Sequence, residues 1–390
     1  MINKNYANLK ESYLFTEIGR RVKAYTEANP DKKVIKMGIG DVTKPLCKAV
    51  TDAMNKAVIE MSTKEGFHGY GPEQGYDFLR NAVANYYKNF GVALKSDEIF
   101  ISDGAKSDLG NILDLFDKDC KVLVQDPVYP VYVDTNIMDG RKILYADAVE
   151  ENGYLPMPSE SCDADIIYIC SPNNPCGAAY TRDMLEEWVS YANSRGAVIL
   201  FDSAYEAFIE DAQVPHSIYE ISGAETCAIE FCSLSKTAGF TGTRCGYTIV
   251  PKALVRDGFE LRKLWLRRQT TKFNGVSYVV QRGAEAVFSA EGQKQIKEQI
   301  RYYKNNAAII ASTFDVLGIS YTGGVNSPYI WLDCKCDSWE FFDKLLNEIQ
   351  VVGTPGAGFG KNGEHHFRLT SFSTLENTTE AMERFKKLKL

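Results

Sequence analysis

AVILFDSAYEAF, at residues 197–208, joins an apolar run of strand length to a cluster of polar side chains. Five further apolar runs have the same character: DEIFIS (97–102), KVLVQD (121–126), DIIYICS (165–171), AIEFCS (228–233) and YTIV (247–250). Near-continuous apolar strands are typical of a sheet that is buried on both faces. Helical patterns separate them, and one of these, RDMLEEWVSYANSRG (182–196), ends on glycine as helices often do. The alternation predicts an α/β fold with a mostly parallel sheet between helices.

The two ends of the chain have different patterns. Residues 291–317 have the periodicity of one long helix, and residues 318–390 indicate a mixed α+β segment. The N-terminal part before them predicts a helix and an arm that are too short to build a core alone. We therefore expect a large α/β domain over residues 38–285 and a smaller α+β domain made from residues 1–37 and 286–390.

Composition excludes several classes of protein. Of the 390 residues, 45% are hydrophobic and 12% aromatic, which is typical of a globular chain and not of a disordered one. The formal charge of −7 and the absence of a long basic run disfavour nucleic acid as a partner. The longest apolar stretches have strand length, well below the ~18 residues of a membrane span, and no signal-peptide core is present. We expect neither a nucleic-acid nor a membrane partner.

The ten cysteines are scattered through the chain and lack the spacing of a zinc site. Reduced thiols in the cytoplasm are the simpler interpretation, and no metal is expected.

Two glycine-rich stretches imitate nucleotide-binding motifs without matching them. GYGPEQG (69–75) follows no predicted strand, and GAGFGKNG (356–363) lacks the Ser or Thr of a P-loop. Both are interpreted as turns that need the conformational freedom of glycine.

Polar side chains follow each predicted strand at the point where it ends. The clusters are DGAKSD (103–108), PVYPVY (127–132), SPNNPCG (171–177), DSAYEAF (202–208) and SLSKTAGFTGTRCGY (233–247). In an open α/β sheet the ligand binds beyond the carboxyl ends of the strands, so these clusters predict one shared site.

The chemistry of these clusters suits a phosphorylated, cationic ring. Ser233, Ser235 and Arg244 together are typical of a phosphate cradle, in which Lys236 is either a further phosphate ligand or a nucleophilic amine. Asp202 would bury a carboxylate at a strand end, which is costly unless it meets a cation such as a protonated pyridine nitrogen. A lysine amine with an acidic partner for the pyridinium is the pattern of pyridoxal phosphate sites.

Three more strand-end residues fit such a ring: Tyr129 can stack on it, and Asn174 and Tyr205 can bind its phenolic oxygen. Taken singly, each residue also has an ordinary explanation, such as a solvated loop lysine, a turn aspartate or a core aromatic. Their joint placement at successive strand ends favours the site.

Four strings in this order resemble fold-type I pyridoxal-phosphate aminotransferases of the aspartate aminotransferase superfamily: SPNNPCG (171–177), DSAYEAF (202–208), SLSKTAGFTGTRCGY (233–247) and FRLTSF (367–372). Closer strings resemble the LL-diaminopimelate aminotransferase family: GIGDVTKPL (38–46), GYGPEQGY (69–76), SDGAKSD (102–108), QDPVYPVYVDTN (125–136) and RQTTKFNGVSY (268–278). Two departures, Leu234 for a frequent Phe and Cys176 for a usual Thr, affect no expected polar contact. The resemblance implies a seven-stranded sheet, pyridoxal 5′-phosphate as cofactor and a homodimer with shared active sites.

The resemblance also implies roles for individual residues. Lys236 would hold the cofactor and transfer the proton, and Asp202 would pair with the ring nitrogen. The other cofactor-binding residues would be Tyr70 of a second copy, Ala105, Lys106, Tyr129, Asn174, Tyr205, Ser233, Ser235, Arg244 and Asn274. Substrate would meet Tyr13, Gly40, Lys106, Tyr129, Asn174, Asn274 and Arg368, with Glu73 of the second copy. Arg368 would bind the α-carboxylate bidentately, and Glu73 would bind the distal ammonium.

The expected reaction is therefore transamination between LL-2,6-diaminopimelate and 2-oxoglutarate, with small amino and oxo acids as the partners. Other members of the superfamily, namely aromatic or alanine aminotransferases and carbon–sulfur lyases, share the cofactor residues and stay open as alternatives. A transcriptional regulator of the same fold is disfavoured, because too few residues precede GIGD at 38–41 for a DNA-binding domain.

Overall fold

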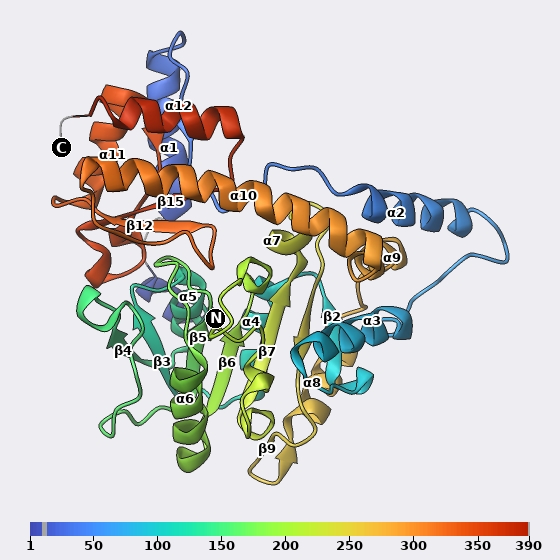
Figure 1. Cartoon of the computed structure of the whole chain (residues 1–390). Coiled ribbons are helices and arrows are strands. Elements are labelled where there is room, and N and C mark those ends of the chain that lie inside the picture. Colours follow the sequence, from blue (N-terminus) through green and yellow to red (C-terminus); the bar gives the residue numbers. More distant parts are fainter. Residues whose placement is uncertain (10–13, 389–390) are drawn as a thin grey trace.

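A seven-stranded sheet forms the centre of the larger part of the computed structural model, which describes residues 1–9 and 14–388 (Figure 1). Its strands lie in the order β2-β8-β7-β6-β5-β3-β4. They are β2 (Ile99–Ser102), β3 (Lys121–Asp126), β4 (Lys142–Asp147), β5 (Ile166–Cys170), β6 (Val198–Asp202), β7 (Ala228–Ser233) and β8 (Gly246–Ile249). In this sheet β8 is antiparallel to both of its neighbours, and every other neighbouring pair is parallel. The predicted fold class is confirmed.

The apolar runs become the inner strands because they have two buried faces. Along β6, Leu200 packs in the core on one side of the sheet, whereas Ile199 and Phe201 pack on the other side with Trp188. Strand β4 was not predicted, and the exposure of its side chains explains why. It lies at the edge of the sheet, and half of its side chains, including Tyr145, are exposed. An edge strand therefore lacks the continuous apolar run by which the others were found.

Helices cover both faces of this sheet. They are α2 (Lys48–Met61), α3 (Asp77–Tyr87), α4 (Ala105–Asn111), α5 (Pro130–Asp139), α6 (Arg182–Arg195), α7 (Leu234–Ala238), α8 (Leu261–Lys272) and α9 (Tyr278–Val287). A small hairpin of β9 (Val255–Arg256) and β10 (Phe259–Glu260) precedes α8. Gly196 ends α6 in the left-handed conformation at φ 70°, as the sequence predicted for this position.

A smaller core lies above the carboxyl ends of the large sheet (Figure 1). Its elements are α1 (Leu14–Ala28), α11 (Ser338–Lys344), α12 (Leu375–Phe385), the sheet β11 (Tyr321–Gly323), β12 (Tyr329–Asp333), β15 (His366–Thr370) and β14 (Thr354–Pro355), and the pair β1 (Ile35–Lys36) with β13 (Val351–Val352). Leu14 and Ile18 of α1 share this core with Trp331 and Phe385, so both ends of the chain build it.

The long helix α10 (Ala290–Leu317) joins the two cores (Figure 1). Ile296 and Ile300 in its first half pack in the large core, and Ile310 and Phe314 in its second half pack in the small one. The domain boundaries at residues 38 and 285 stay a prediction, because one helix belongs to both cores. Among the described residues, no helix is long and apolar enough to cross a membrane.

Candidate active site

A pocket of about 320 Å³ opens between the carboxyl ends of the large sheet and the small core. Twelve residues that the sequence indicated line it: Gly40, Ala105, Lys106, Tyr129, Asn174, Asp202, Tyr205, Ser233, Ser235, Lys236, Arg244 and Arg368. Strands β2, β3, β5, β6 and β7 deliver most of them, because each polar cluster follows directly on its strand. The strand ends therefore do meet at one site.

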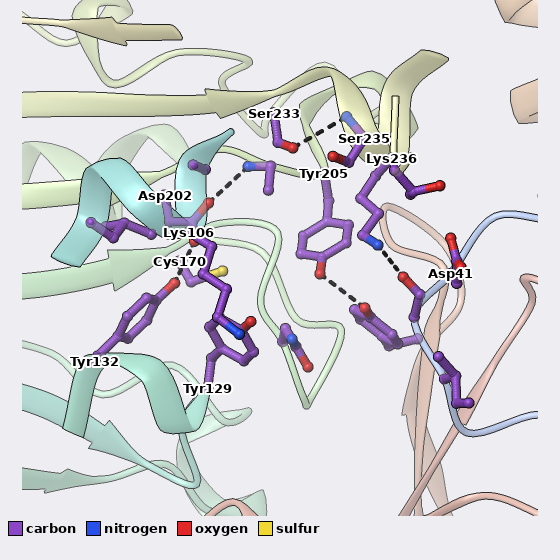
Figure 2. A pocket seen from close by; sticks show the side chains of 18 of the residues that line it. Asp41, Lys106, Tyr129, Tyr132, Cys170, Asp202, Tyr205, Ser233, Ser235 and Lys236 are labelled. Atoms are coloured by element: carbon purple, nitrogen blue, oxygen red, sulfur yellow. Dashed lines mark hydrogen bonds between the residues drawn. The ribbon is translucent and has the colours of Figure 1, made fainter. Parts of the chain in front are cut away.

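Lys236 projects from α7 into the pocket, opposite the segment that carries Gly40 and Asp41 (Figure 2). Its amine donates a hydrogen bond to the carbonyl oxygen of Gly40. Burial, aided by the charges of Arg368 and Arg244, lowers the pKa of Lys236 to about 8 against the opposing effect of the Asp41 carboxylate. An amine with this pKa has a substantial neutral fraction near pH 8, far more than an ordinary lysine, and the neutral form is the nucleophile and the base.

Asp202 lies at the end of β6 on the opposite side of the pocket (Figure 2). Its carboxylate accepts hydrogen bonds from the Tyr132 hydroxyl at 2.6 Å and the Ala204 amide at 3.0 Å. Burial raises the pKa of Asp202, and both hydrogen bonds act against that rise. Because both donors are neutral, a cation that entered the pocket would meet a carboxylate whose charge they leave uncompensated.

A basic, hydroxyl-rich corner lies between α4, α7 and the start of β8. The Arg244 guanidinium donates to the Ser235 hydroxyl at 3.2 Å, and the Ser233 hydroxyl accepts from the Ser235 amide at 3.2 Å. Gly104 leaves room for the guanidinium, since a Cβ there would lie 2.6 Å from Arg244 Nη2. Arginine, hydroxyl groups and a missing side chain are what an oxyanion such as a phosphate requires.

Arg368 of β15 is the most deeply buried cation of the pocket, with 1% of its surface exposed. It donates to the Asn174 side chain, to the carbonyl of Gly38 at 2.7 Å and to the Thr354 hydroxyl at 3.4 Å. The Tyr329 ring centroid lies 4.3 Å from the guanidinium carbon. These contacts leave the group little freedom, which favours recognition of a carboxylate in one orientation.

Several further residues line the same pocket without an individual role predicted from the sequence: Phe15, Ile39, Asp41, Leu109, Tyr132, Cys170, Ala204, Thr241 and Tyr329. Tyr132, Ala204 and Thr241 lie within the strand-end clusters, and Cys170 ends a predicted strand. Tyr329 belongs to the sheet of the small core and donates to or accepts from the Tyr205 hydroxyl at 2.9 Å, a contact with no local signal in the sequence.

Three predicted residues lie outside this pocket. Tyr70 is 92% exposed and Asn274 is also exposed, while Glu73 is partly buried. A Cβ on Gly275 would lie 3.1 Å from the Pro72 carbonyl, so the segment of Asn274 runs beside that of Glu73. Asn274 does not line the pocket of its own chain, and its expected role in substrate and cofactor binding stays a prediction. Tyr13 falls outside the described residues.

The family model named "Aminotransferase class I and II" matches residues 32–385. The chain belongs to this aminotransferase family. A curated relative from Lachnospira eligens, named LL-diaminopimelate aminotransferase, is 54% identical, and the alignment covers 99% of each chain. A second curated relative of the same name, from Methanosphaera stadtmanae, is 53% identical, and the alignment covers 99% of this chain and 98% of that relative. The solved L,L-diaminopimelate aminotransferase of Chlamydomonas reinhardtii is 45% identical and superposes with a TM-score of 0.95. The match covers 99% of this chain and 98% of that structure.

The family implies pyridoxal phosphate, and the donor set of the pocket fits that cofactor. The corner of Arg244, Ser233 and Ser235 suits its phosphate, and Gly104 gives the Arg244 guanidinium room to reach this corner. The buried carboxylate of Asp202 suits the protonated ring nitrogen, and the neutral amine of Lys236 suits the aldehyde.

We expect Lys236 of the cofactor-free protein to react with an amine-selective acylating reagent with a midpoint near pH 8. Its pKa is lowered by burial, so the reactive neutral form predominates above that pH and is lost below it. Peptide mass spectrometry across a pH series measures the labelling. Asp41→Asn should move the midpoint lower, because Asp41 stabilises the ammonium form. A midpoint above about 10, the ordinary range of lysine, would contradict the assignment.

Replacement of Tyr132 by Phe should shift the acid limb of the turnover profile to higher pH by about one unit. The Tyr132 hydroxyl stabilises the ionised Asp202, so its removal raises the pKa of that carboxyl further and protonates it at higher pH. Tyr168→Phe is the matched control, because Tyr168 stacks on Tyr132 and its hydroxyl contacts Asn136. Equal shifts in both variants would contradict the role of Tyr132.

Proposed function

We propose that this chain transfers an amino group from LL-2,6-diaminopimelate to 2-oxoglutarate, giving (S)-2,3,4,5-tetrahydrodipicolinate and L-glutamate. The observation that carries the proposal is the full-length identity of 54% to a curated LL-diaminopimelate aminotransferase. The pocket supports it, because it combines the neutral amine of Lys236, the buried carboxylate of Asp202 and the held guanidinium of Arg368. The reaction is a step toward lysine and cell-wall precursors.

The cofactor would be held at both ends by residues of this chain. Arg244 and the hydroxyls of Ser233 and Ser235 would bind the phosphate, with Ala105, Lys106 and the Tyr70 of a second copy. Tyr129 would cover the ring, and Asp202, Asn174 and Tyr205 would hold its polar atoms. Pyridoxal phosphate, when bound, supplies an aldehyde that takes up amino groups and a ring that draws electrons away from Cα.

Lys236 would act as the base. Its Nζ can take the proton from the substrate Cα only when the amine is neutral, and the pKa of about 8 makes that form available near neutral pH. Asp41 faces the same amine and raises its pKa, which balances the effect of the two arginines. Asp202 would act from the far side, where an ionised carboxylate keeps a ring nitrogen protonated.

Arg368 would orient the substrate. The guanidinium is held by the Gly38 carbonyl, the Thr354 hydroxyl and the Asn174 side chain, and Arg368 lines the pocket. A bidentate pair with the α-carboxylate would then fix the direction of the Cα proton. This clamp serves every amino acid and oxo acid, including 2-oxoglutarate.

The distal end of diaminopimelate carries a second carboxylate and a second ammonium. Lys106 lines the mouth of the pocket and is exposed, so it can meet the carboxylate. The ammonium would meet Glu73 of a second copy, with Tyr70 and Asn274 beside it. The resemblance to the family implies this assignment, and it is compatible with the structure, in which none of the three residues lines the pocket of its own chain.

A second copy is also supported by exposed apolar side chains close in sequence to Glu73. Val58, Ile59, Phe67 and Tyr70 are between 54% and 92% exposed within one stretch of the chain. Contiguous exposed apolar residues of this size are typical of an interface. We therefore infer a homodimer in which each pocket receives residues from both copies. All ten cysteines are free thiols, which favours the cytoplasm as the compartment.

The proposed reaction is tested with a panel of amino donors and 2-oxoglutarate as acceptor. We expect glutamate to form fastest with LL-diaminopimelate, and Lys236→Ala to lower the rate by at least about a hundredfold. Glutamate release is measured with a coupled dehydrogenase. Faster turnover of an aromatic donor or alanine would assign the chain to another member of the family, and elimination of a thiol from cysteine conjugates would assign it to the lyases.

Glu73→Gln should lower kcat/KM for LL-diaminopimelate by about tenfold or more, while a donor that lacks the distal amine should be affected little. Glu65→Gln, an exposed change in the same segment, is the control. Mixed dimers of Glu73→Gln with Lys236→Ala should regain activity toward LL-diaminopimelate, because one pocket then receives both native residues. Failure of the mixture to exceed Glu73→Gln alone would mean that Glu73 does not act on the neighbouring pocket.

A further inference from the structure

The glycine-rich stretch GAGFGKNG, residues 356–363, folds into two short 3-10 turns between β14 and β15. Its amide groups bind a carboxylate of the protein itself. The amide of Lys361 donates to Asp126 Oδ2 at 3.2 Å, and that of Asn362 donates to Asp126 Oδ1 at 3.1 Å. A loop whose amides close on an internal carboxylate is an anchor between two parts of the chain.

The Asn362 side chain completes this anchor. Its Nδ2 donates to the Asp126 carbonyl at 3.2 Å and to Asp147 Oδ1 at 2.7 Å, which ties the loop to the ends of β3 and β4. Gly360 stands against the same carboxylate with φ at 146°, and a Cβ there would lie 2.0 Å from Asp126 Oδ1. The glycine is therefore required for the close approach and not for a nucleotide.

Phe359, in the middle of the 356–363 loop, contacts both sides of the active site. Its carbonyl accepts the amide of Val128 at 2.8 Å, and Val128 directly precedes Tyr129. Its ring centroid lies 4.8 Å from the guanidinium carbon of Arg368, and the same ring packs edge-on against Trp331. One residue thus touches the backbone next to Tyr129 and the side chain of Arg368.

We propose that the 356–363 loop sets the position of Arg368 relative to Tyr129, and that Asp126 and Asn362 are positioning residues for carboxylate binding. The proposal rests on the proposed role of Arg368 as the carboxylate clamp. Tyr129 follows β3 of the large sheet, whereas Arg368 lies in β15 of the small core. The 356–363 loop connects the two residues through contacts outside the pocket. If the anchor loosens, Phe359 no longer supports the guanidinium, and Arg368 binds the carboxylate of every substrate more weakly.

The effect should fall on binding more than on chemistry. Lys236 and Asp202 make no contact with the 356–363 loop among the interactions of the described residues, so proton transfer should be kept. Loss of an interaction that is equally strong in the ground state and in the transition state raises KM and leaves kcat nearly unchanged. Because every substrate carries the α-carboxylate, all substrates should be affected alike.

Two variants test the anchor from its two sides. Asp126→Asn replaces one carboxylate oxygen by an amide that cannot accept from the loop, and Asn362→Ala removes the side-chain bonds without a change in β3. The control is Asp163→Asn, because Asp163 is an exposed partner of Lys121 at the opposite end of β3. KM and kcat are measured for LL-diaminopimelate, L-glutamate and 2-oxoglutarate, and calorimetry gives the Kd of 2-oxoglutarate.

For both anchor variants we expect KM and Kd to rise about tenfold for all three substrates, with kcat within about threefold of the native value. The control should match the native enzyme. Native KM in Asn362→Ala overturns the proposal even if Asp126→Asn fails to fold, and so does a loss confined to LL-diaminopimelate. If the native protein binds 2-oxoglutarate but does not turn over diaminopimelate, only the proposed donor is refuted. If it binds none of the three substrates, the proposed function and the positioning role of the loop are both overturned.

Discussion

The arrangement of the pocket depends on the hydrogen bonds of the buried Arg368 guanidinium. This group is almost fully buried, and a buried cation is tolerated only when its donors find acceptors. The acceptors come from three segments that are distant in sequence: the Gly38 carbonyl, the Asn174 side chain and the Thr354 hydroxyl. Around this one charge the N-terminal segment, a strand end of the large sheet and the sheet of the small core meet at the pocket.

Most of the large sheet was predictable, because a strand that is buried on both faces has a continuous apolar run in its sequence. The runs at 121–126 and 228–233 coincide with β3 and β7 to the residue. The direction of β8 was not predictable in the same way, since a short apolar run has the same appearance in a parallel and in an antiparallel strand. Strand β4 was missed because its exposed edge position requires no such run.

The site was predictable to the extent that it is made of strand ends. The rule that ligands bind beyond the carboxyl ends identified Asp202, Lys236 and Arg244 from their place in the chain. It has no means of finding Tyr329, which approaches from the small core, because no local pattern marks a residue that packs across from another sheet. Tyr70, Glu73 and Asn274 pose a different problem. They do not line the pocket of their own chain, so their proposed role depends on the proposed second copy.

The walls of the pocket explain how its two chemical groups are tuned in opposite senses. Burial lowers the pKa of Lys236 and raises that of Asp202, because an apolar environment disfavours whichever form is charged. For the proposed role of Lys236 as the base this effect is useful by itself, since that role needs the neutral amine. For the proposed role of Asp202 it is harmful by itself, since that role needs the ionised carboxylate. The Tyr132 hydroxyl and the Ala204 amide offset part of that rise, and a cationic ring nitrogen would offset more. One apolar pocket can thus serve both groups only when a cation lies beside Asp202.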